Sequence, residues 1–349
     1  MLRWDNHPAR RVAPATMEVK MARGWTCVAV AVVLCGSAAP AWATFPGGNG
    51  SIVYGWFGGS VYRGRTSETS IRAVDPTSGI FRVLRDCPLR FGPSAYTDCS
   101  VGSPRSSPDG QTIAFANERT TPDFEGGPWQ SQPGIAMMAP DGTGLVEHAT
   151  QHRSWTFAWA PSGDRLLLTR DVPASGLLPT PEALFLATLD GSEVNQVAPV
   201  WSSDADWSSR GQIAYVRDRN GDPTCRSGSC QDLFLTRLGR APRRLTYRGG
   251  SSPSWSSHGT KLAFVRNTRS GRAAIYTVQR DGTDLHRLTS RGGDPVWSPD
   301  GKWIAFTRYG DLYVIRTNGR GLRRLVDSPY SGLDCPCVGS VDWQSVPRR

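Results

Sequence analysis

The most regular feature of the chain is a pattern of short apolar segments separated by turns that contain glycine. Trp297 opens it as WSPDGKWIAFTRYGDLYVIRTNGRGLRRL, in which one apolar segment follows each of two turns. Related strings begin at Trp255, Trp207 and Trp159, and Ser106 takes the Trp position in SSPDGQTIAFANE. Apolar segments this short, bounded by Gly, Asp and Asn, are typical of β-strands joined by tight turns. The pattern therefore predicts an all-β protein built from one repeated unit.

Each repeated unit holds enough strand segments for one four-stranded sheet. An inner strand ends at the Trp position, and strands such as Ile304-Ala305-Phe306 and Leu312-Tyr313-Val314 precede a last strand. Successive Trp positions lie 42 to 53 residues apart, which is the spacing of propeller blades. Glycines mark the first turn at Gly50, Gly110, Gly163, Gly211, Gly259 and Gly301. In four units an Asp-Gly or Asn-Gly pair marks the second turn, because these residues tolerate the positive φ of a tight hairpin.

Two half-units at the ends of the repeat complement each other. Asn49-Gly50 and the strand Ser51–Tyr54 supply a turn and a second strand, whereas Val341-Asp342-Trp343 supplies a first strand. We expect these segments to pair in one composite blade, which closes the ring and leaves no free sheet edge. The predicted fold class is an all-β, six-bladed β-propeller of four-stranded antiparallel blades.

The recurring W-S-P-D-G-x-x-I/L-A-F string resembles the blade signature of the TolB-type six-bladed β-propellers, relatives of the WD-repeat propellers. The resemblance extends from about Phe45 to Trp343 and implies a propeller over that whole range. TolB of the Tol system carries an additional α/β domain ahead of its propeller, and we find no room for one between Thr44 and the first repeat. The resemblance therefore implies the shape of TolB and not its role in the Tol system.

Residues 1–43 differ in composition from the repeats. Their second half, MARGWTCVAVAVVLCGSAAPAWA, has a short basic start, an apolar stretch at Val28–Leu34 and the small residues of Ala41-Trp42-Ala43. We expect a secretory signal peptide, preceded by an N-terminal extension and cleaved before Thr44. Retention as a membrane anchor is the alternative, although the apolar stretch is short for a membrane-spanning helix. Residues 44–349 then form a single propeller domain that is secreted, periplasmic or held in the cell envelope.

Export favours disulfide bonds over zinc sites for the remaining cysteines. Cys225 and Cys230 lie close together in one segment and are predicted to be bridged. Cys87, Cys99, Cys335 and Cys337 allow three pairings, of which we predict the local Cys87–Cys99 bridge. A Cys335–Cys337 bridge would close a very small, strained ring, so pairing between the two segments stays open.

No arrangement of side chains in the sequence indicates catalysis. A G-x-S-x-G nucleophile elbow is absent, so an acyl-transfer mechanism has no nucleophile. His148 and His152 are four residues apart, but they fall at a predicted strand end and in the loop after it. His258 replaces the Asp of a repeated turn. We therefore assign no catalytic, cofactor-binding or metal-binding residue and expect no cofactor.

One segment leaves a metal site open. Asp218, Asn220 and Asp222 resemble the start of a calcium loop, with oxygen ligands at alternate positions. The position of the bidentate Glu is Ser229, so a turn stapled by cysteines is the simpler interpretation.

Two sets of repeated side chains invite a functional interpretation but suit a structural one better. Asp109 and Asp300 each begin one blade turn, and we expect them to cap that turn rather than to form an acid–base pair. One Trp stands at the same place in each of five units, and we expect packing between blades rather than sugar stacking. The positions are Trp159, Trp207, Trp255, Trp297 and Trp343.

The net charge of +10 at pH 7 favours an acidic partner such as an anionic glycan. The basic residues, almost all of them arginines, are scattered along the sequence, so we expect no nucleic-acid partner. Long segments interrupt the repeat at 85–103, 120–133, 172–182, 217–232 and 326–339, and they are the expected carriers of specificity.

The function that fits this organisation is binding. We expect a monomeric, non-catalytic scaffold of the cell envelope whose loops and central funnel meet a protein, peptide or glycan. The alternative is a propeller enzyme, a polysaccharide lyase or hydrolase with its site at the channel mouth. A docked subunit or sensor fragment is a third possibility.

Overall fold

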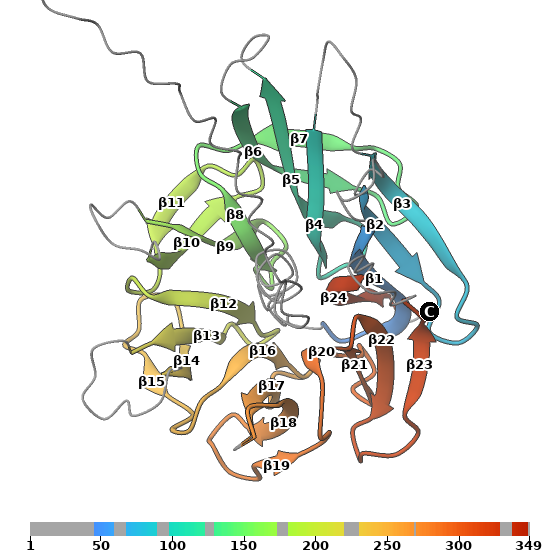
Figure 1. Cartoon of the computed structure of the whole chain (residues 1–349). Coiled ribbons are helices and arrows are strands. Elements are labelled where there is room, and N and C mark those ends of the chain that lie inside the picture. The colour runs from blue at the N-terminus through green and yellow to red at the C-terminus, as the bar shows by residue number, and fades with distance from the viewer. Residues whose placement is uncertain are drawn as a thin grey trace, which may run out of the picture.

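The computed structural model describes residues 45–58, 68–88, 98–122, 129–172, 181–219, 230–268, 270–328 and 337–347. These residues form six sheets of four antiparallel strands, arranged as blades around one axis (Figure 1). The described residues contain no α-helix, and thus none that is long and apolar enough to cross a membrane. The predicted six-bladed propeller is confirmed.

The first three blades, each given from the axis outward, are as follows. Blade 1 consists of β24 (Cys337–Val346), β1 (Gly48–Gly58), β2 (Glu68–Val74) and β3 (Phe81–Pro88). Blade 2 consists of β4 (Asp98–Ser106), β5 (Ile113–Pro122), β6 (Trp129–Met138) and β7 (Val146–Ala149). Blade 3 consists of β8 (Ser154–Trp159), β9 (Arg165–Asp171), β10 (Glu182–Thr188) and β11 (Glu193–Gln196).

The other three blades follow the same order. Blade 4 consists of β12 (Ser202–Trp207), β13 (Ile213–Asp218), β14 (Gln231–Thr236) and β15 (Arg243–Arg244). Blade 5 consists of β16 (Ser251–Trp255), β17 (Lys261–Asn267), β18 (Ala273–Gln279) and β19 (His286–Arg287). Blade 6 consists of β20 (Gly293–Trp297), β21 (Trp303–Arg308), β22 (Asp311–Arg316) and β23 (Arg323–Val326).

The two ends of the chain complete blade 1 together, as predicted. In Figure 1 the red β24 lies beside the blue β1, and Trp343 faces Ile52 in the antiparallel register. Trp343 is 3% exposed, and its Nε1 donates a hydrogen bond to the carbonyl oxygen of Gly50 (3.1 Å). Gly50 itself corrects one expectation, because it lies inside β1 and not in a turn. The chain enters blade 1 at its second strand, so no turn is needed there.

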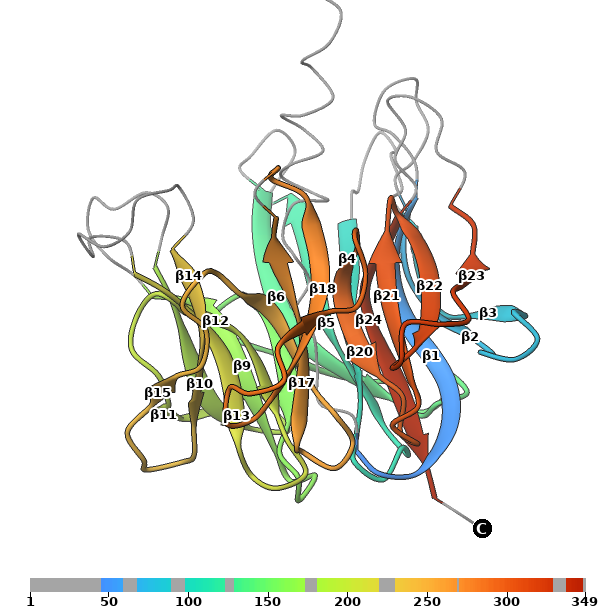
Figure 2. The same ribbon diagram turned by 90° about the horizontal axis from the view of Figure 1, so that it is seen from below.

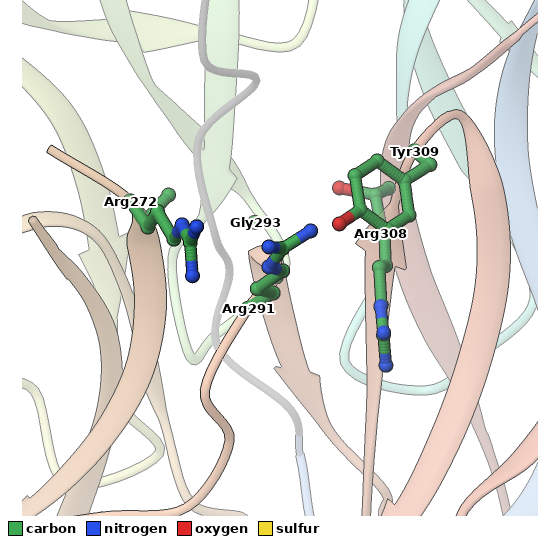
Figure 3. Close-up of a pocket in the computed structure, with 8 residues that line it drawn as sticks. Arg272, Arg291, Gly293, Arg308 and Tyr309 are labelled. Atoms are coloured by element: carbon green, nitrogen blue, oxygen red, sulfur yellow. The ribbon is translucent and has the colours of Figure 1, made fainter. Parts of the chain in front are cut away.

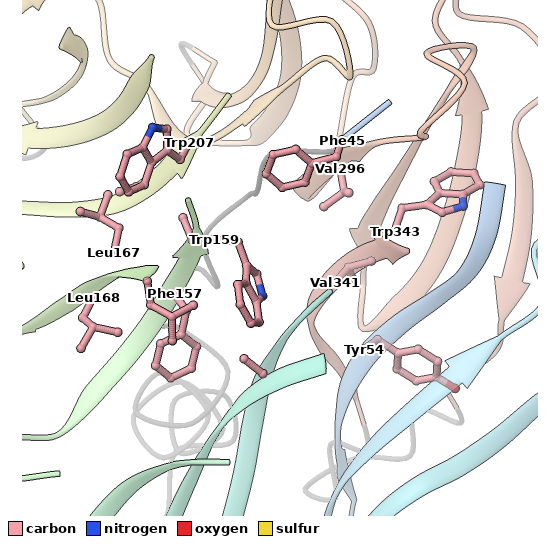
Figure 4. Packing of buried hydrophobic residues seen from close by; sticks show 14 of the residues in the cluster. Phe45, Tyr54, Phe157, Trp159, Leu167, Leu168, Trp207, Val296, Val341 and Trp343 are labelled. Carbon is pink, nitrogen blue, oxygen red and sulfur yellow. The ribbon is translucent and has the colours of Figure 1, made fainter. Parts of the chain in front are cut away.

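The five tryptophans pack between blades, as expected. Trp255 shares a buried cluster with Leu233 and Leu235 of blade 4, and Trp297 shares another with Ala263 and Ile275 of blade 5. Figure 4 shows the remaining three, Trp159, Trp207 and Trp343, within the largest buried cluster. A large ring at the end of five of the six inner strands therefore fills the wedge between neighbouring sheets, whereas β4 ends at Ser106.

Side chains of the inner strands also join one blade to the next. Asp342 of β24 accepts a hydrogen bond from the backbone N–H of Ser106 in β4 (2.7 Å). Asp206 of β12 likewise accepts from the backbone N–H of Trp255 in β16 (2.5 Å). Both acceptors occupy the position just before the Trp position of their own unit. Each carboxyl therefore satisfies a buried backbone donor of the adjacent blade.

The blades run between two faces of the disc, seen edge-on in Figure 2. We call one the turn face: it holds the Gly turns after the inner strands, such as those at Gly110, Gly259 and Gly301, which have φ of 63° to 71°. The opposite loop face holds the starts of the inner strands and the connections between second and third strands, such as Tyr309-Gly310. All five long segments start and end at strand ends on the loop face.

The structure contains the predicted Cys87–Cys99 disulfide bond. It joins the end of β3 in blade 1 to the start of β4 in blade 2, with the two Cα atoms 5.7 Å apart. Cys230 is also disulfide-bonded. The Cys87–Cys99 bond excludes a bridge from either residue to Cys335 or Cys337, the alternative that the sequence leaves open. Cys225 and Cys335 lie outside the described residues, so the Cys225–Cys230 bridge stays a prediction.

Closure of the ring can be tested at Gly110, where a Cβ atom would overlap the carbonyl oxygen of Ser345 in β24. Gly110→Ala should lower the free energy of unfolding by about 2–5 kcal/mol, because overpacking adds to the cost of a left-handed residue. Gly239→Ala is the matched control, with φ of 71° against 70° and no atom within 4 Å of the added methyl group. It should cost about 1–2 kcal/mol. Equal losses in urea unfolding would contradict the contact between blade 2 and β24.

The carboxyl between blades can be tested at Asp206. Asp206→Ala leaves the buried N–H of Trp255 without its acceptor and should lower the free energy of unfolding by about 1–3 kcal/mol. Asp206→Asn keeps an acceptor oxygen, so its free energy of unfolding should fall distinctly less than that of Asp206→Ala. Thermal unfolding of the three proteins makes the comparison, and an alanine variant as stable as the wild type would show that this hydrogen bond does not support the ring.

Candidate functional site

The candidate site begins with charged side chains on the inner strands, where the repeat loses its regularity. One position before the Trp position stand Arg105, Asp206 and Asp342, whereas the other three blades have Ala, Ser and Val there. Three positions before it stand Asp204 and Asp294. These five side chains form an electrostatically coupled group, which we call the axial cluster.

A bulge in the inner strands places the axial cluster. The register of the inner strand shifts against its neighbour in every blade, and in four blades a non-glycine residue has a φ near 50° there. These residues are Ser103, Asp204, Ser252 and Asp294. Asp and Asn visit this backbone region more readily than most residues, and bulges of this kind re-aim side chains. The bulge therefore explains why short polar residues recur at this position.

Arg105 is the cation of the axial cluster and is only 2% exposed. Its Nε donates to the carbonyl oxygen of Phe157 (3.2 Å), and its own carbonyl oxygen accepts from Nε1 of Trp159 (3.1 Å). Burial lowers the pKa of Arg105 well below its usual range, and the surrounding carboxylates, Asp342 first, oppose that shift. A buried guanidinium with carboxylates on several sides thus ties blade 2 to blades 1, 3, 4 and 6.

Burial raises the pKa of the carboxyl groups in the axial cluster, whereas it lowers that of Arg105. Burial raises the pKa of Asp204 and Asp206 well above the usual range, and it raises that of Asp342 against the effect of Arg105. For Asp294, burial raises the pKa to about 7, although Thr307 and Arg105 act to lower it. Nearby, burial followed by the charge of Asp171 raises the pKa of Glu182.

The members of the axial cluster differ in what they can do chemically. Asp206 and Asp342 are buried and accept hydrogen bonds from the backbone of the next blade, so they stabilise the packing of neighbouring blades. Asp204 and Asp294 are half-buried and lie nearer the loop face, because the inner strands start there. Asp294 Oδ2 accepts from Oγ1 of Thr307 (2.9 Å), and its Oδ1 has no hydrogen-bond partner in the described part of the chain. Asp294 thus combines a raised pKa with a buried oxygen that has no described hydrogen-bond partner, a combination found at many functional sites.

A cavity of about 380 Å³ opens on the loop face between blades 5 and 6, next to Asp294 (Figure 3). Three segments line it: the start of β18, the residues that lead into β20, and the end of β21 with its turn. The lining residues are Arg272, Ala273, Arg291, Gly292, Gly293, Thr307, Arg308 and Tyr309.

The residues considered at the sequence level lie elsewhere. Asp109 and Asp300 each bind the Ser and the backbone of their own turn, as predicted. His148 lies in β7, at a strand end as expected, and His258 lies in a turn beside Ser257. Asp218 ends β13, whereas Asn220 and Asp222 fall outside the described residues, so calcium binding there stays untested. The described residues bring together no group of three His, Cys, Asp or Glu side chains suited to a metal ion.

The axial cluster was missed because the motif was aligned at its Trp and Gly positions. Comparing the residues one and three places before each Trp position would have singled out Arg105 and Asp294 as departures from the repeat. The arginines of the cavity had no comparable pattern, since Arg272, Arg291 and Arg308 belong to different segments.

Comparison with known proteins gives partial matches at the sequence level. No family model matches the chain. The Tol-Pal system protein TolB of Syntrophus aciditrophicus is 38% identical over 79 residues, which is 19% of this chain and 17% of that protein. The uncharacterized peptidase YuxL of Bacillus subtilis is 32% identical over 109 residues, 28% of this chain and 16% of YuxL. The chain thus matches less than a fifth of the length of either relative.

Solved structures match over much more of the chain. TolB from Acinetobacter baumannii superimposes with a TM-score of 0.62 at 14% identity, covering 90% of this chain and 70% of that one. A TolB-type protein from Agrobacterium tumefaciens gives a TM-score of 0.56 at 17% identity, covering 79% of this chain and 92% of that one. At such identities the likeness concerns the fold alone. Together with the six closed blades, it shows that the chain has the fold of the TolB-type six-bladed β-propellers.

Proposed function

We propose that the chain is an exported, non-catalytic binding propeller whose loop face and channel mouth meet a protein, peptide or anionic glycan of the cell envelope. The observation that carries this proposal is the asymmetry of the two faces. All five long segments depart from strand ends on the loop face, whereas the turn face repeats the same short Gly turns. Variable segments on one face of a rigid ring are the usual way in which such scaffolds select partners.

The contacts of the axial cluster support a scaffold role. Asp342 and Asp206 hold backbone N–H groups of neighbouring blades, and Arg105 binds a carbonyl oxygen of blade 3. These three side chains therefore stabilise contacts between blades. Export rests on the signal-like segment at 21–43, and the relatives that are named as TolB belong to the Tol-Pal system.

One observation favours the alternative of an enzyme at the channel mouth. Asp294 combines a pKa of about 7 with an oxygen that no described residue binds. Such a group suits general acid or base catalysis on a glycan. The two proposals differ in what they expect of Asp294.

The binding role can be tested by photo-crosslinking in the cell of origin. A benzoyl-phenylalanine residue at Tyr309, which is 62% exposed on the loop face, should capture a defined partner. The same residue at Phe81, 53% exposed at the turn-face end of β3, is the matched aromatic control and should capture none. Adducts from Phe81 alone would place the partner on the wrong face.

The role of Asp294 can be tested with Asp294→Asn. Because the folded state raises this pKa, the contribution of Asp294 to stability is full below about pH 4 and is lost as the pH rises through about 7. The free energy of unfolding of the wild type should therefore fall over that interval. The free energy of unfolding of the variant minus that of the wild type should rise by roughly 1–3 kcal/mol between pH 4 and pH 8. Urea unfolding at both pH values makes the measurement.

The same variant separates the two functions. Wild-type protein should show no turnover of peptidase, esterase or polysaccharide substrates. Turnover that is abolished by Asp294→Asn, while the variant remains folded, would establish the enzyme and overturn the binding proposal.

A further inference from the structure

Three arginines surround the cavity on the loop face between blades 5 and 6. Arg272 stands just before β18, Arg291 leads into β20, and Arg308 ends β21. Figure 3 shows Arg291 between Arg272 and Tyr309, with its guanidinium turned toward the Tyr309 ring, and Arg308 beyond it, extending along its own strand below Tyr309. The guanidinium carbons of Arg291 and Arg308 each lie 5.4 Å from the centre of the Tyr309 ring.

Arg272, Arg291 and Arg308 have no acidic partner among the described residues. Other arginines, such as the exposed Arg240 and Arg320, have none either, but these three line one cavity. Elsewhere, Arg219 and Arg244 pair with Asp232, and Arg324 pairs with Asp311. No ion pair occurs at Arg272, Arg291 or Arg308 within the described ranges. Nε of Arg308 is moreover buried, and no described atom accepts its hydrogen bond. Three arginines thus line one cavity without an acidic partner among the described residues.

The floor of the cavity depends on two glycines. A Cβ atom at Gly292 would come within 2.8 Å of the Phe306 ring, and one at Gly293 within 3.1 Å of Oγ1 of Thr307. Side chains at these positions would have to displace the packing beneath them or fill the cavity. The carboxyl that follows, Asp294, is held by Thr307, and burial raises its pKa, which weakens its ability to neutralise the arginines.

We propose that this cavity binds a phosphate group, either as the free ion or as a phosphate ester. Guanidinium groups present paired N–H donors that match the oxygens of phosphate, and several can share one such anion. A single carboxylate would engage one guanidinium fork and leave the other charges unbalanced. The cavity volume exceeds what one phosphate ion needs, so there is room for an organic group beside Tyr309. This proposal rests on the proposed function in one respect, which is that the loop face is taken as the binding face.

The test measures binding to purified full-length protein by isothermal titration calorimetry at low ionic strength in phosphate-free buffer. The probes are inorganic phosphate, glycerol 3-phosphate and acetate. Wild-type protein should bind at least one of the two phosphates more tightly than acetate. Binding of inorganic phosphate alone would identify the free ion as the ligand, and tighter binding of glycerol 3-phosphate would identify an ester.

Matched variants separate the cavity from general charge. Arg272→Gln combined with Arg291→Gln should weaken phosphate binding about tenfold or more, because charge-assisted hydrogen bonds are lost. Arg240→Gln combined with Arg320→Gln removes the same charge from exposed positions on the turn face and should change the affinity less than about twofold. Unchanged melting temperatures show that both double variants are folded.

Three outcomes would overturn the proposal: no binding by the wild type up to about 10 mM, equal binding by wild type and cavity variant, or an equal loss in the control. None of them bears on partner capture at Tyr309. Failure of the phosphate site and failure of the proposed binding function can thus be told apart.

Discussion

The pairing of β24 with β1 is the interaction on which the rest of the structure depends. In the described residues the strands of each blade pack mainly against the two neighbouring blades, so an open ring would expose the sheet faces and inner-strand edges on both sides of the gap. Blade 1 obtains its inner strand from the end of the chain and its other three strands from the beginning. The register of Trp343 against Ile52 therefore holds together segments almost 300 residues apart.

Charged groups near the axis extend this closure around the ring. Burying Arg105 and the carboxyls of Asp206 and Asp342 is costly, and the cost is offset where each group meets a backbone partner in another blade. The register of the inner strand shifts close to each of these residues. A ring held in this way keeps its loop face in a constant geometry, which a binding surface requires.

Much of this architecture could be predicted from the sequence because packing repeats. Trp at the end of each inner strand and Gly in the following turn are required in almost every blade, so their recurrence gave the number of blades and the closure at Trp343. Gly50 was misplaced in a turn because the first unit begins at its second strand. The repeated turns predict the interior of the repeat well, and they predict the first, incomplete unit less well.

The candidate sites could be predicted far less, for a physical reason. Arg105 and Asp294 act through neighbours in other blades, and such contacts depend on the bulge and on the curvature of the ring rather than on spacing along the chain. Arg272, Arg291 and Arg308 look like scattered surface charges in the sequence, whereas the junction of two blades brings them to one cavity. Function in this fold thus depends on positions that the repeat leaves free.

The most direct test of the account is removal of the strand that closes the ring. A chain that lacks residues 338–349 should self-associate, lose much of its thermal stability and exchange the amide hydrogens of β1 rapidly. A chain that lacks only 347–349, beyond the end of β24, should behave as the wild type does. Size-exclusion chromatography with light scattering, together with hydrogen exchange, measures all three properties. A monomeric 338–349 deletion with an unchanged melting temperature and a protected β1 would contradict closure through β24.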